Sequence, residues 1–356
     1  MPALELDGRR FGRYVALAPP RFLLTGRPLP HALNKLNNIG GLVATVMTRS
    51  REIAAALAGE GIGVMVGCSG NPFDLPAAYL AARRLRVPFV AYLFDDPVYQ
   101  WEPGVYRSLA RFWERIWGLG SASMIAPNEV LADDLRLRLP HADIAIVRNP
   151  VGSAAFAPPA SDGGWGEETG DAGTLLYTGS VYSAQASAFR NLLAALAELD
   201  GRFHLNVYTA QSADQMVAHG VCGPEVRHLP HTSQDVALEL QKRADILFLP
   251  LAFVSPIPEV VRSSAPAKLG EYLASGRPIL AHAPRGSFVS ELLKTHQAAL
   301  VVDQPDPALL KEALLALATD EALGKRLVVS AQRLAREFHV DRARDAFLAA
   351  ISRATD

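Results

Sequence analysis

Short apolar runs rich in β-branched residues alternate with Ala- and Leu-rich stretches of helical period along most of the chain. This alternation is typical of βαβ units, in which crossover helices join parallel strands. Helix-like segments such as 50–61 and 74–87 separate the runs in the first half. Six candidate strands are expected there, at residues 13–18, 41–47, 61–68, 88–94, 123–128 and 144–149.

Residues 151–173 break this pattern with Gly, Pro, Ser and acidic residues, as an interdomain linker does. The alternation then resumes, and a helical tail follows from residue 307. The expected strands are 174–180, 204–210, 225–231, 245–251, 277–283 and 298–304, with helices at 185–199, 234–243, 265–275 and 288–295. We therefore predict an α/β protein with two Rossmann-like, doubly wound parallel-sheet domains, 1–150 and 174–338. The C-terminal helix, 339–356, is expected to cross back to the first domain.

Composition narrows the class of protein. Apolar residues make up 49% of the 356 residues and charged residues 20%, as in an ordinary globular protein. A formal net charge of −1 argues against a nucleic-acid partner. Charged residues interrupt the N-terminus and no apolar stretch approaches the roughly 20 residues of a membrane span, so we expect a cytoplasmic location.

The segment SSAPAKLGEYLASGRPILA, residues 263–281, contains the most informative pair of charges. Pro266 suits the first turn of the expected helix 265–275, Ser263 or Ser264 can cap it, and Gly276 can end it. Lys268 and Glu271 then share one face near the positive end of the helix.

Such an arrangement has two interpretations. A lysine beside free backbone amides can bind an anion, and a carboxylate one turn later can accept from two adjacent hydroxyls. Phosphates and a ribose diol together indicate a nucleotide. The alternative is an exposed ion pair between Lys268 and Glu271 that contributes little. The loop Thr178-Gly179-Ser180 follows a strand, but the chain has neither a dinucleotide-binding glycine motif nor a P-loop.

The string PAKLGEYLASGRPILA, with RGSFVSELL and AALVVDQPDPALLKEAL after it, resembles the nucleotide-binding half of retaining glycosyltransferases of the GT-B fold, the family four group. The segments IVRNPVGSAAFAP, LLYTGSVYS, RADILFLPL and EFHVDRARDAFLAAI follow in that family's order. The resemblance implies two domains facing across a cleft, with acceptor bound by the first and nucleotide sugar by the second. It also implies a UDP- or GDP-sugar as co-substrate, no metal and no further cofactor.

The resemblance assigns roles to residues of the second domain. Glu271 would bind the ribose hydroxyls, and His231 would lie near the base. Lys268 would neutralise the diphosphate together with backbone amides of Thr178, Gly179, Ser180, Ser264 and Ala265. The chain departs from the family pattern at Ser263, where a first glutamate is expected, and Glu259 in a Pro-rich loop is the candidate to replace it. No basic residue follows the glycine loop before Arg190.

The first half supplies the candidates for the acceptor side. Asp95 and Asp96 end a strand where the family often has a histidine, and either could position or deprotonate an acceptor hydroxyl. The alternative is that one of them caps the turn before Pro97. His31, Arg21 and Arg27 could meet the acceptor or the diphosphate, with a plain loop role as the alternative.

A basic amphipathic helix is expected at residues 105–117. Its predicted apolar face bears Val105, Leu109, Phe112, Trp113 and Ile116, and Arg107, Arg111 and Arg115 form a stripe. Such a helix can lie at a membrane interface, or it can cover a sheet. A membrane contact would make the protein peripheral on the inner face of the cytoplasmic membrane and would suit a lipid-linked acceptor.

These features predict a glycosyltransferase of the hexosyltransferase class that moves a sugar from a nucleoside diphosphate to an acceptor hydroxyl. The resemblance adds retention at the anomeric carbon and polysaccharide or glycolipid synthesis. Two alternatives stay open: another enzyme of this fold, an inverting transferase or a nucleotide-sugar epimerase, and a non-catalytic partner subunit.

Overall fold

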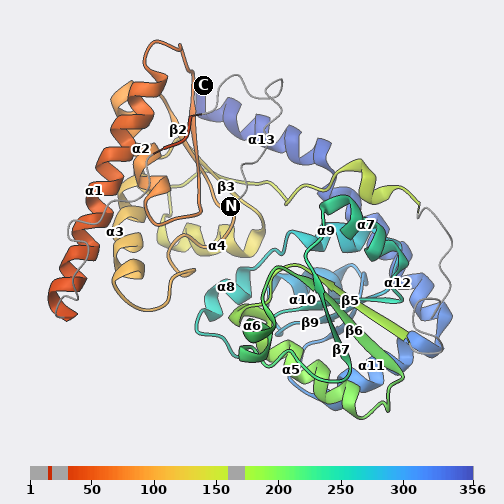
Figure 1. Cartoon of the computed structure of the whole chain (residues 1–356). Coiled ribbons are helices and arrows are strands. Elements are labelled where there is room, and N and C mark those ends of the chain that lie inside the picture. Colours follow the sequence, from red (N-terminus) through yellow and green to blue (C-terminus); the bar gives the residue numbers. More distant parts are fainter. Residues whose placement is uncertain (1–14, 18–30, 159–172, 356) are drawn as a thin grey trace. The chain divides into compact units, whose positions relative to one another are not determined.

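The computed structural model describes residues 15–17, 31–158 and 173–355 (Figure 1). The chain divides into two compact units. The first consists of the described parts of residues 1–125, 138–144 and 350–356, and the second of those of 126–137 and 145–349. None of the described helices is long and apolar enough to cross a membrane.

The first unit is built around a sheet in which β1, β2 and β3 pair in parallel and β4 lies beside β3. Helices α1 and α2 pack together, and α2 also contacts α3. The elements are α1 (His31–Leu57), β1 (Met65–Cys68), α2 (Asp74–Leu85), β2 (Phe89–Tyr92), α3 (Val105–Gly120), β3 (Ser123–Ala126) and β4 (Ile144–Ile146). Helix α4 (Glu129–Arg138) follows β3 in the chain and groups with the second unit up to Leu137.

Residues 41–47 were predicted as a strand and belong instead to helix α1. The β-branched residues there suggested a strand, but the buried positions follow a helical spacing: Leu42, Thr45 and Val46 are buried, whereas Val43 between them is exposed. Packing of this apolar stripe decides the structure over local β-propensity. The strand predicted at 13–18 lies largely outside the described residues, and its described part, 15–17, has no regular structure.

The second unit contains a six-stranded parallel sheet in the order β10-β9-β8-β5-β6-β7. Its strands are β5 (Gly173–Thr178), β6 (Phe203–Thr209), β7 (Val226–Pro230), β8 (Ile246–Pro250), β9 (Ile279–His282) and β10 (Leu300–Val302). Its helices are α5 (Ser183–Ala197), α6 (Ala213–Ala218), α7 (Gln234–Arg243), α8 (Pro258–Ser263), α9 (Lys268–Ala274), α10 (Phe288–Thr295), α11 (Pro307–Thr319), α12 (Glu321–Ala335) and α13 (Val340–Thr355), with short 3₁₀ turns η1 (Ser153–Phe156) and η2 (Arg336–Phe338).

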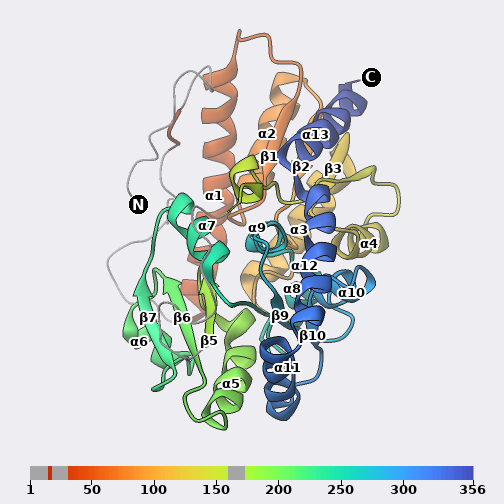
Figure 2. The same ribbon diagram turned by 90° about the vertical axis from the view of Figure 1, so that its right-hand side faces the viewer.

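Helices cover both faces of this sheet, and α5 and α11 lie side by side on one of them (Figure 2). Alternate residues of β5, β8 and β9 enter different cores. Leu175, Tyr177 and Phe248 pack with side chains of α5 and α11. Leu176 and Leu247 pack with side chains of α7, α9, α10 and α12. Strands buried on both faces explain the nearly continuous apolar runs of the sequence.

The strand order of the second unit reverses between β5 and β8. In open parallel sheets such a switch point forms a crevice outside the carboxyl ends of the two strands, where ligands bind. The residues that follow β5 and β8, and the helices α7 and α9 beside them, are therefore the place to look for a site. The two parallel-sheet α/β units confirm the predicted fold class. The last described residues, from Ala350 onward, group with the first unit, while Val340–Ala349 group with the second.

Candidate functional site

The loop after β5 turns sharply at Gly179, whose φ of +122° favours glycine. Two of the three predicted anion-binding amides are already used within the protein. The Thr178 amide donates to Tyr272 Oη at 3.1 Å, and the Gly179 amide donates to the carbonyl of Tyr208 at 2.9 Å. Within the described part of the chain, only the Ser180 amide of this loop makes no hydrogen bond.

Lys268 lies directly beside this loop. Its Nζ donates to Tyr177 Oη at 2.8 Å and lies 4.0 Å from the centre of the Tyr177 ring. A Cβ at position 179 would come within 3.0 Å of that Nζ, a second reason for glycine. Burial lowers the pKa of Lys268 to about 7, although the charge of Glu271 acts to raise it. The ammonium is thus aimed at the loop but poorly stabilised there.

Glu271 faces helix α7. Gln234 Nε2 donates to Glu271 Oε1 at 3.2 Å, and Gln241 Nε2 donates to Glu271 Oε2 at 3.0 Å. Gln241 Nε2 also lies 3.2 Å from Thr178 Oγ1, which ties the carboxylate to the end of β5. Neither glutamine was predicted as a site residue, because a glutamine on an amphipathic helix is expected on its solvent-facing surface.

Lys268 and Glu271 make no ion pair with each other, although both lie within the described residues. The lysine turns to the glycine loop and the glutamate turns to α7. The alternative interpretation, an exposed ion pair between Lys268 and Glu271, is therefore wrong. The two side chains present a cation and a carboxylate to neighbouring elements at the switch point of the sheet.

The loop between α8 and α9 carries two further predicted residues, Ser264 and Ala265. Asn128 Nδ2 donates to the carbonyl of Ser263 at 2.8 Å, and Asn149 Nδ2 donates to the carbonyl of Ala265 at 2.7 Å. No hydrogen bond from the amides of Ser264 and Ala265 occurs among the described residues. Two asparagines thus fix the carbonyl side of this loop and leave its amide side available.

The helix carrying Lys268 begins later than predicted. Helix α9 starts at Lys268 rather than at residue 265, and neither Ser263 nor Ser264 caps it. Ser263 instead ends the separate helix α8 and donates to the carbonyl of Glu259 at 3.1 Å. Glu259, predicted to lie in a loop, therefore stands in the first turn of α8. Gly276, with φ +78°, follows the end of α9 as expected.

His231 lies on the exposed loop between β7 and α7. Gln234, three residues later, donates to Glu271, so this loop leads into the helix that contacts Glu271. The second unit thereby brings together the glycine loop, Lys268, Glu271 and the start of α7.

In the first unit the two aspartates after β2 have different surroundings. Asp96 is buried: its Oδ1 accepts from the amides of Val98 and Tyr99, both at 2.9 Å, and its Oδ2 pairs with Arg138. Arg138 also pairs with the buried Glu114. Asp96 thus caps the turn around Pro97, which is the role predicted as the alternative to catalysis. Asp95 is exposed as a residue, and partial burial of its carboxyl group, followed by the charge of Asp96, raises its pKa to about 6.

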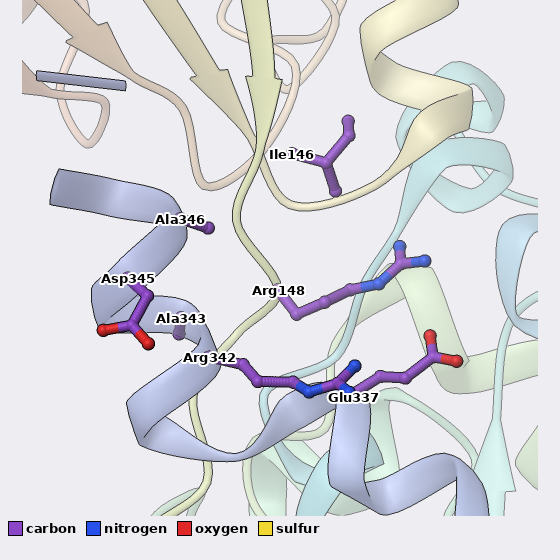
Figure 3. A pocket seen from close by; sticks show the side chains of 7 residues that line it. All are labelled: Ile146, Arg148, Glu337, Arg342, Ala343, Asp345 and Ala346. Carbon is purple, nitrogen blue, oxygen red and sulfur yellow. The ribbon is translucent and has the colours of Figure 1, made fainter. Parts of the chain in front are cut away.

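The remaining acceptor-side candidates receive little support. Arg21 and Arg27 lie outside the described residues. His31 is the first residue of α1, and its side chain lies outside the described part as well. The chain also has a cavity of about 380 Å³ in the second unit, where the side chains of Arg148, Arg342 and Glu337 extend in one direction (Figure 3). None of the predicted site residues lines it.

Helix α3 buries part of the predicted apolar face: Trp113 is buried and Val105, Leu109 and Ile116 are half-buried. Trp117 is also buried, but Phe112 is 56% exposed. Arg107 donates to the carbonyl of Trp101 at 2.6 Å and is partly buried. Arg111 and Arg115 are exposed, so only these two arginines of the predicted stripe face solvent.

The second unit matches a known protein family. Residues 172–320 match the family described as Glycosyl transferases group 1. No curated protein matches the chain.

Solved structures share the fold over most of the chain at low sequence identity. The Anabaena protein Alr3699/HepE, solved with UDP-glucose, is 13% identical with a TM-score of 0.65, covering 90% of this chain and 83% of that one. A trehalose-6-phosphate synthase is 11% identical with a TM-score of 0.66, covering 88% and 78%. A putative UDP-N-acetylglucosamine 2-epimerase from Listeria monocytogenes is 12% identical with a TM-score of 0.56, covering 87% and 79%.

The predicted resemblance is confirmed for the second unit by the family match, and the predicted fold by the solved structures. Residues 172–320 match the glycosyltransferase group 1 family, and the chain shares the fold of these structures over most of its length.

Proposed function

We propose that the second unit binds a nucleoside diphosphate sugar, with UDP-sugars as the first class to test. One observation carries this proposal: at the switch point of the sheet, Lys268 lies beside a glycine loop while Glu271, one turn later, presents a carboxylate. A neighbour of the same fold, HepE, was solved with UDP-glucose, which supports UDP as the carrier.

The chemistry follows from the charges. Departure of the diphosphate concentrates negative charge, so catalysis needs cations and amide donors already in place. Lys268 supplies the cation, and the amides of Ser180, Ser264 and Ala265 supply donors. Glu271 accepts hydrogen bonds from the ribose hydroxyls and fixes the nucleotide. Neither Ser263, which bonds to its own helix, nor Glu259 is required by this assignment.

We further propose transfer with retention, and no metal or cofactor beyond the nucleotide sugar. The trehalose-6-phosphate synthase of similar fold was studied as a case of glycosyl transfer with retention, which supports the first point. On the acceptor side we propose Asp95 rather than Asp96 as the carboxylate that meets the acceptor hydroxyl. Asp96 is already occupied by two amides and Arg138.

The test is turnover. The protein is incubated with UDP- and GDP-sugars, with and without EDTA, and with simple glycosides and lipid-linked sugars as acceptors. Release of the nucleoside diphosphate together with a new α-linked product from an α-linked donor supports the proposal. Inverted product would indicate the inverting alternative. Epimerised nucleotide sugar without acceptor would favour the epimerase, whose fold a Listeria protein shares. Binding without turnover would favour the non-catalytic subunit.

We also propose that the acceptor is presented at an anionic membrane surface. The outer face of α3 exposes 56% of Phe112 and 74% of Leu119, next to the exposed Arg111 and Arg115. Large apolar side chains interleaved with arginines match an interface of acyl chains and anionic headgroups.

Vesicle co-sedimentation tests this contact. The wild type should sediment with phosphatidylglycerol vesicles, and Phe112→Ser or the double variant Arg111→Ala, Arg115→Ala should not. Leu137→Ser, which removes an apolar side chain that is 82% exposed on α4, is the matched control. Equal sedimentation of all four proteins, or of none, contradicts the proposal.

A further inference from the structure

Gln241 is buried in the second unit, yet its side chain donates a hydrogen bond to the carboxylate of the half-exposed Glu271. Its Nε2 has two N–H groups, and the two acceptors within reach are Thr178 Oγ1 at 3.2 Å and Glu271 Oε2 at 3.0 Å. The reverse orientation of the carboxamide would place a carbonyl oxygen against the carboxylate, so Glu271 itself determines which way Gln241 points. The Gln241 amide therefore fixes the Glu271 carboxylate relative to Thr178 at the end of β5.

The other end of the same side chain is unsatisfied. Gln241 Oε1 is buried and makes no hydrogen bond with any residue that the structure describes. An unpaired buried carbonyl oxygen destabilises a fold, and an apolar residue of similar shape would avoid this penalty. Gln241 thus costs stability through its oxygen, while its nitrogen bonds to the Glu271 carboxylate. A role in the site explains this residue better than a role in the core does.

Gln234 completes the arrangement from the start of the same helix. It is exposed, and its Nε2 donates to the second carboxylate oxygen, Glu271 Oε1, at 3.2 Å. One helix thus holds both oxygens of Glu271, one from a buried position and one from the rim. Each carboxylate oxygen accepts more than one hydrogen bond, so both keep capacity for further donors.

We propose that Gln234 and Gln241 are positioning residues that orient the Glu271 carboxylate toward a vicinal diol, and that discrimination between ribose and deoxyribose nucleotides depends on them. This inference rests on the proposed function, because it takes Glu271 as the residue that meets the nucleotide sugar ring.

The first arm of the test needs no ligand. Thermal melts of Gln241→Leu, Glu271→Gln and the double variant measure whether the two side chains interact. Gln241→Leu also removes the unpaired buried carbonyl, so we expect it to fold and melt within a few degrees of the wild type. Shifts that do not add show the coupling. Shifts that add overturn the inference and leave the proposed function untouched.

The second arm measures binding of UDP and 2′-deoxy-UDP by calorimetry. We expect the wild type to prefer UDP by about tenfold or more, since a lost hydrogen bond to a carboxylate has about that effect. Gln241→Leu and Gln234→Ala should each reduce this preference by about threefold or more. Asp235→Asn, on the exposed surface of the same helix turn, is the control and should keep the wild-type preference.

A pH profile separates positioning from general damage. Gln241→Glu places a second carboxyl group beside Glu271, and two such groups cannot both stay ionised at low cost. Lys268 and Tyr272, on whose pKa values the charge of Glu271 acts, are titratable groups near this carboxylate, and they are common to both proteins. UDP affinity of Gln241→Glu, divided by that of the wild type at the same pH, should therefore recover as pH falls from 8 to 5.5.

The outcomes are distinct. A flat ratio for Gln241→Glu across this pH range, or an unchanged UDP preference in Gln241→Leu and Gln234→Ala, overturns the inference alone. A wild type that binds UDP and 2′-deoxy-UDP equally well overturns the role of Glu271 that the inference assumes. No UDP binding by the wild type contradicts the proposed function, and the inference falls with it.

Discussion

Lys268 and Glu271 stand three residues apart on helix α9, yet each bonds to a different element of the second unit. Lys268 reaches Tyr177 at the end of β5, and Glu271 reaches Gln234 and Gln241 on α7. The first turn of α9 therefore contacts both β5 and α7 at the switch point of the sheet. Under the proposed function, Lys268 would meet the diphosphate and Glu271 the ribose of one nucleotide.

The low pKa of Lys268 predicts proton uptake when a diphosphate binds. Burial holds this pKa at about 7, so above that pH the free lysine is mostly neutral. A bound anion favours the charged form, so UDP affinity should fall as pH rises above about 7, with uptake approaching one proton. Calorimetry at pH 8 in two buffers of different ionisation enthalpy measures the uptake. Lys268→Arg stays charged and should lose it; equal uptake in both proteins would exclude Lys268 as the source.

The same pKa predicts how stability depends on pH. In the unfolded chain Lys268 titrates near 10.5, so between about pH 7 and pH 10.5 the unfolded state binds more protons than the folded state. The contribution of Lys268 to the free energy of unfolding therefore rises with pH in this window. Lys268→Met should raise the melting temperature at pH 7 by a few degrees and flatten this slope. A lower melting temperature for Lys268→Met would contradict the sign.

Gly270 lies between the two charged residues and allows α9 to pack closely. A Cβ there would collide with the side chain of Val151 and approach Phe338. Overpacking of this kind costs about 1–3 kcal/mol. Gly270→Ala should therefore lower the melting temperature by about 2–4 °C per kcal/mol and weaken UDP binding by moving α9. Gly152→Ala, with open space around the new Cβ, is the control. A Gly270→Ala protein as stable as that control would show that α9 can move freely.

Asp95 and Asp96 should respond differently to the same substitution. Asp96→Asn weakens the buried network with Arg138 and Glu114, so it should lower the melting temperature by several degrees. Asp95→Asn should leave folding intact and remove an acid limb near pH 6 from the pH dependence of kcat/KM, because the pKa of Asp95 is about 6. An unchanged pH profile in Asp95→Asn would remove this residue from the acceptor site.

Much of the second unit could be predicted from sequence because its central strands, β5, β8 and β9, are buried on both faces. Runs such as 245–251 then form nearly continuous apolar segments, which can be recognised without knowledge of long-range packing. Residues 41–47 show the limit. They carry the same β-branched composition, but long-range packing of Leu42 and Val46 decides for a helix, and composition alone carries no information about that packing.

The site was predictable where a residue's own chemistry defines its role. Charge and spacing marked Lys268 and Glu271 as candidates, and the family resemblance supplied the roles proposed for them. Gln241, Asn128 and Asn149 could not, because their roles depend on contacts with residues far away in sequence. The face of α3 was mispredicted at Phe112 for a related reason: the second tryptophan, Trp117, sets the buried side, and its burial depends on the rest of the unit.

The most direct test of a nucleotide site at Lys268 and Glu271 is a set of thermal melts. Wild type and Glu271→Ala are compared with UDP, GDP, ADP, CMP and dTDP. Ligand at 100 times its Kd adds about 2.7 kcal/mol to the free energy of unfolding, enough for a shift of several degrees. We expect one nucleoside diphosphate, UDP first, to raise the melting temperature of the wild type and not that of Glu271→Ala. No shift with any of them, or an equal shift in both proteins, would contradict the account.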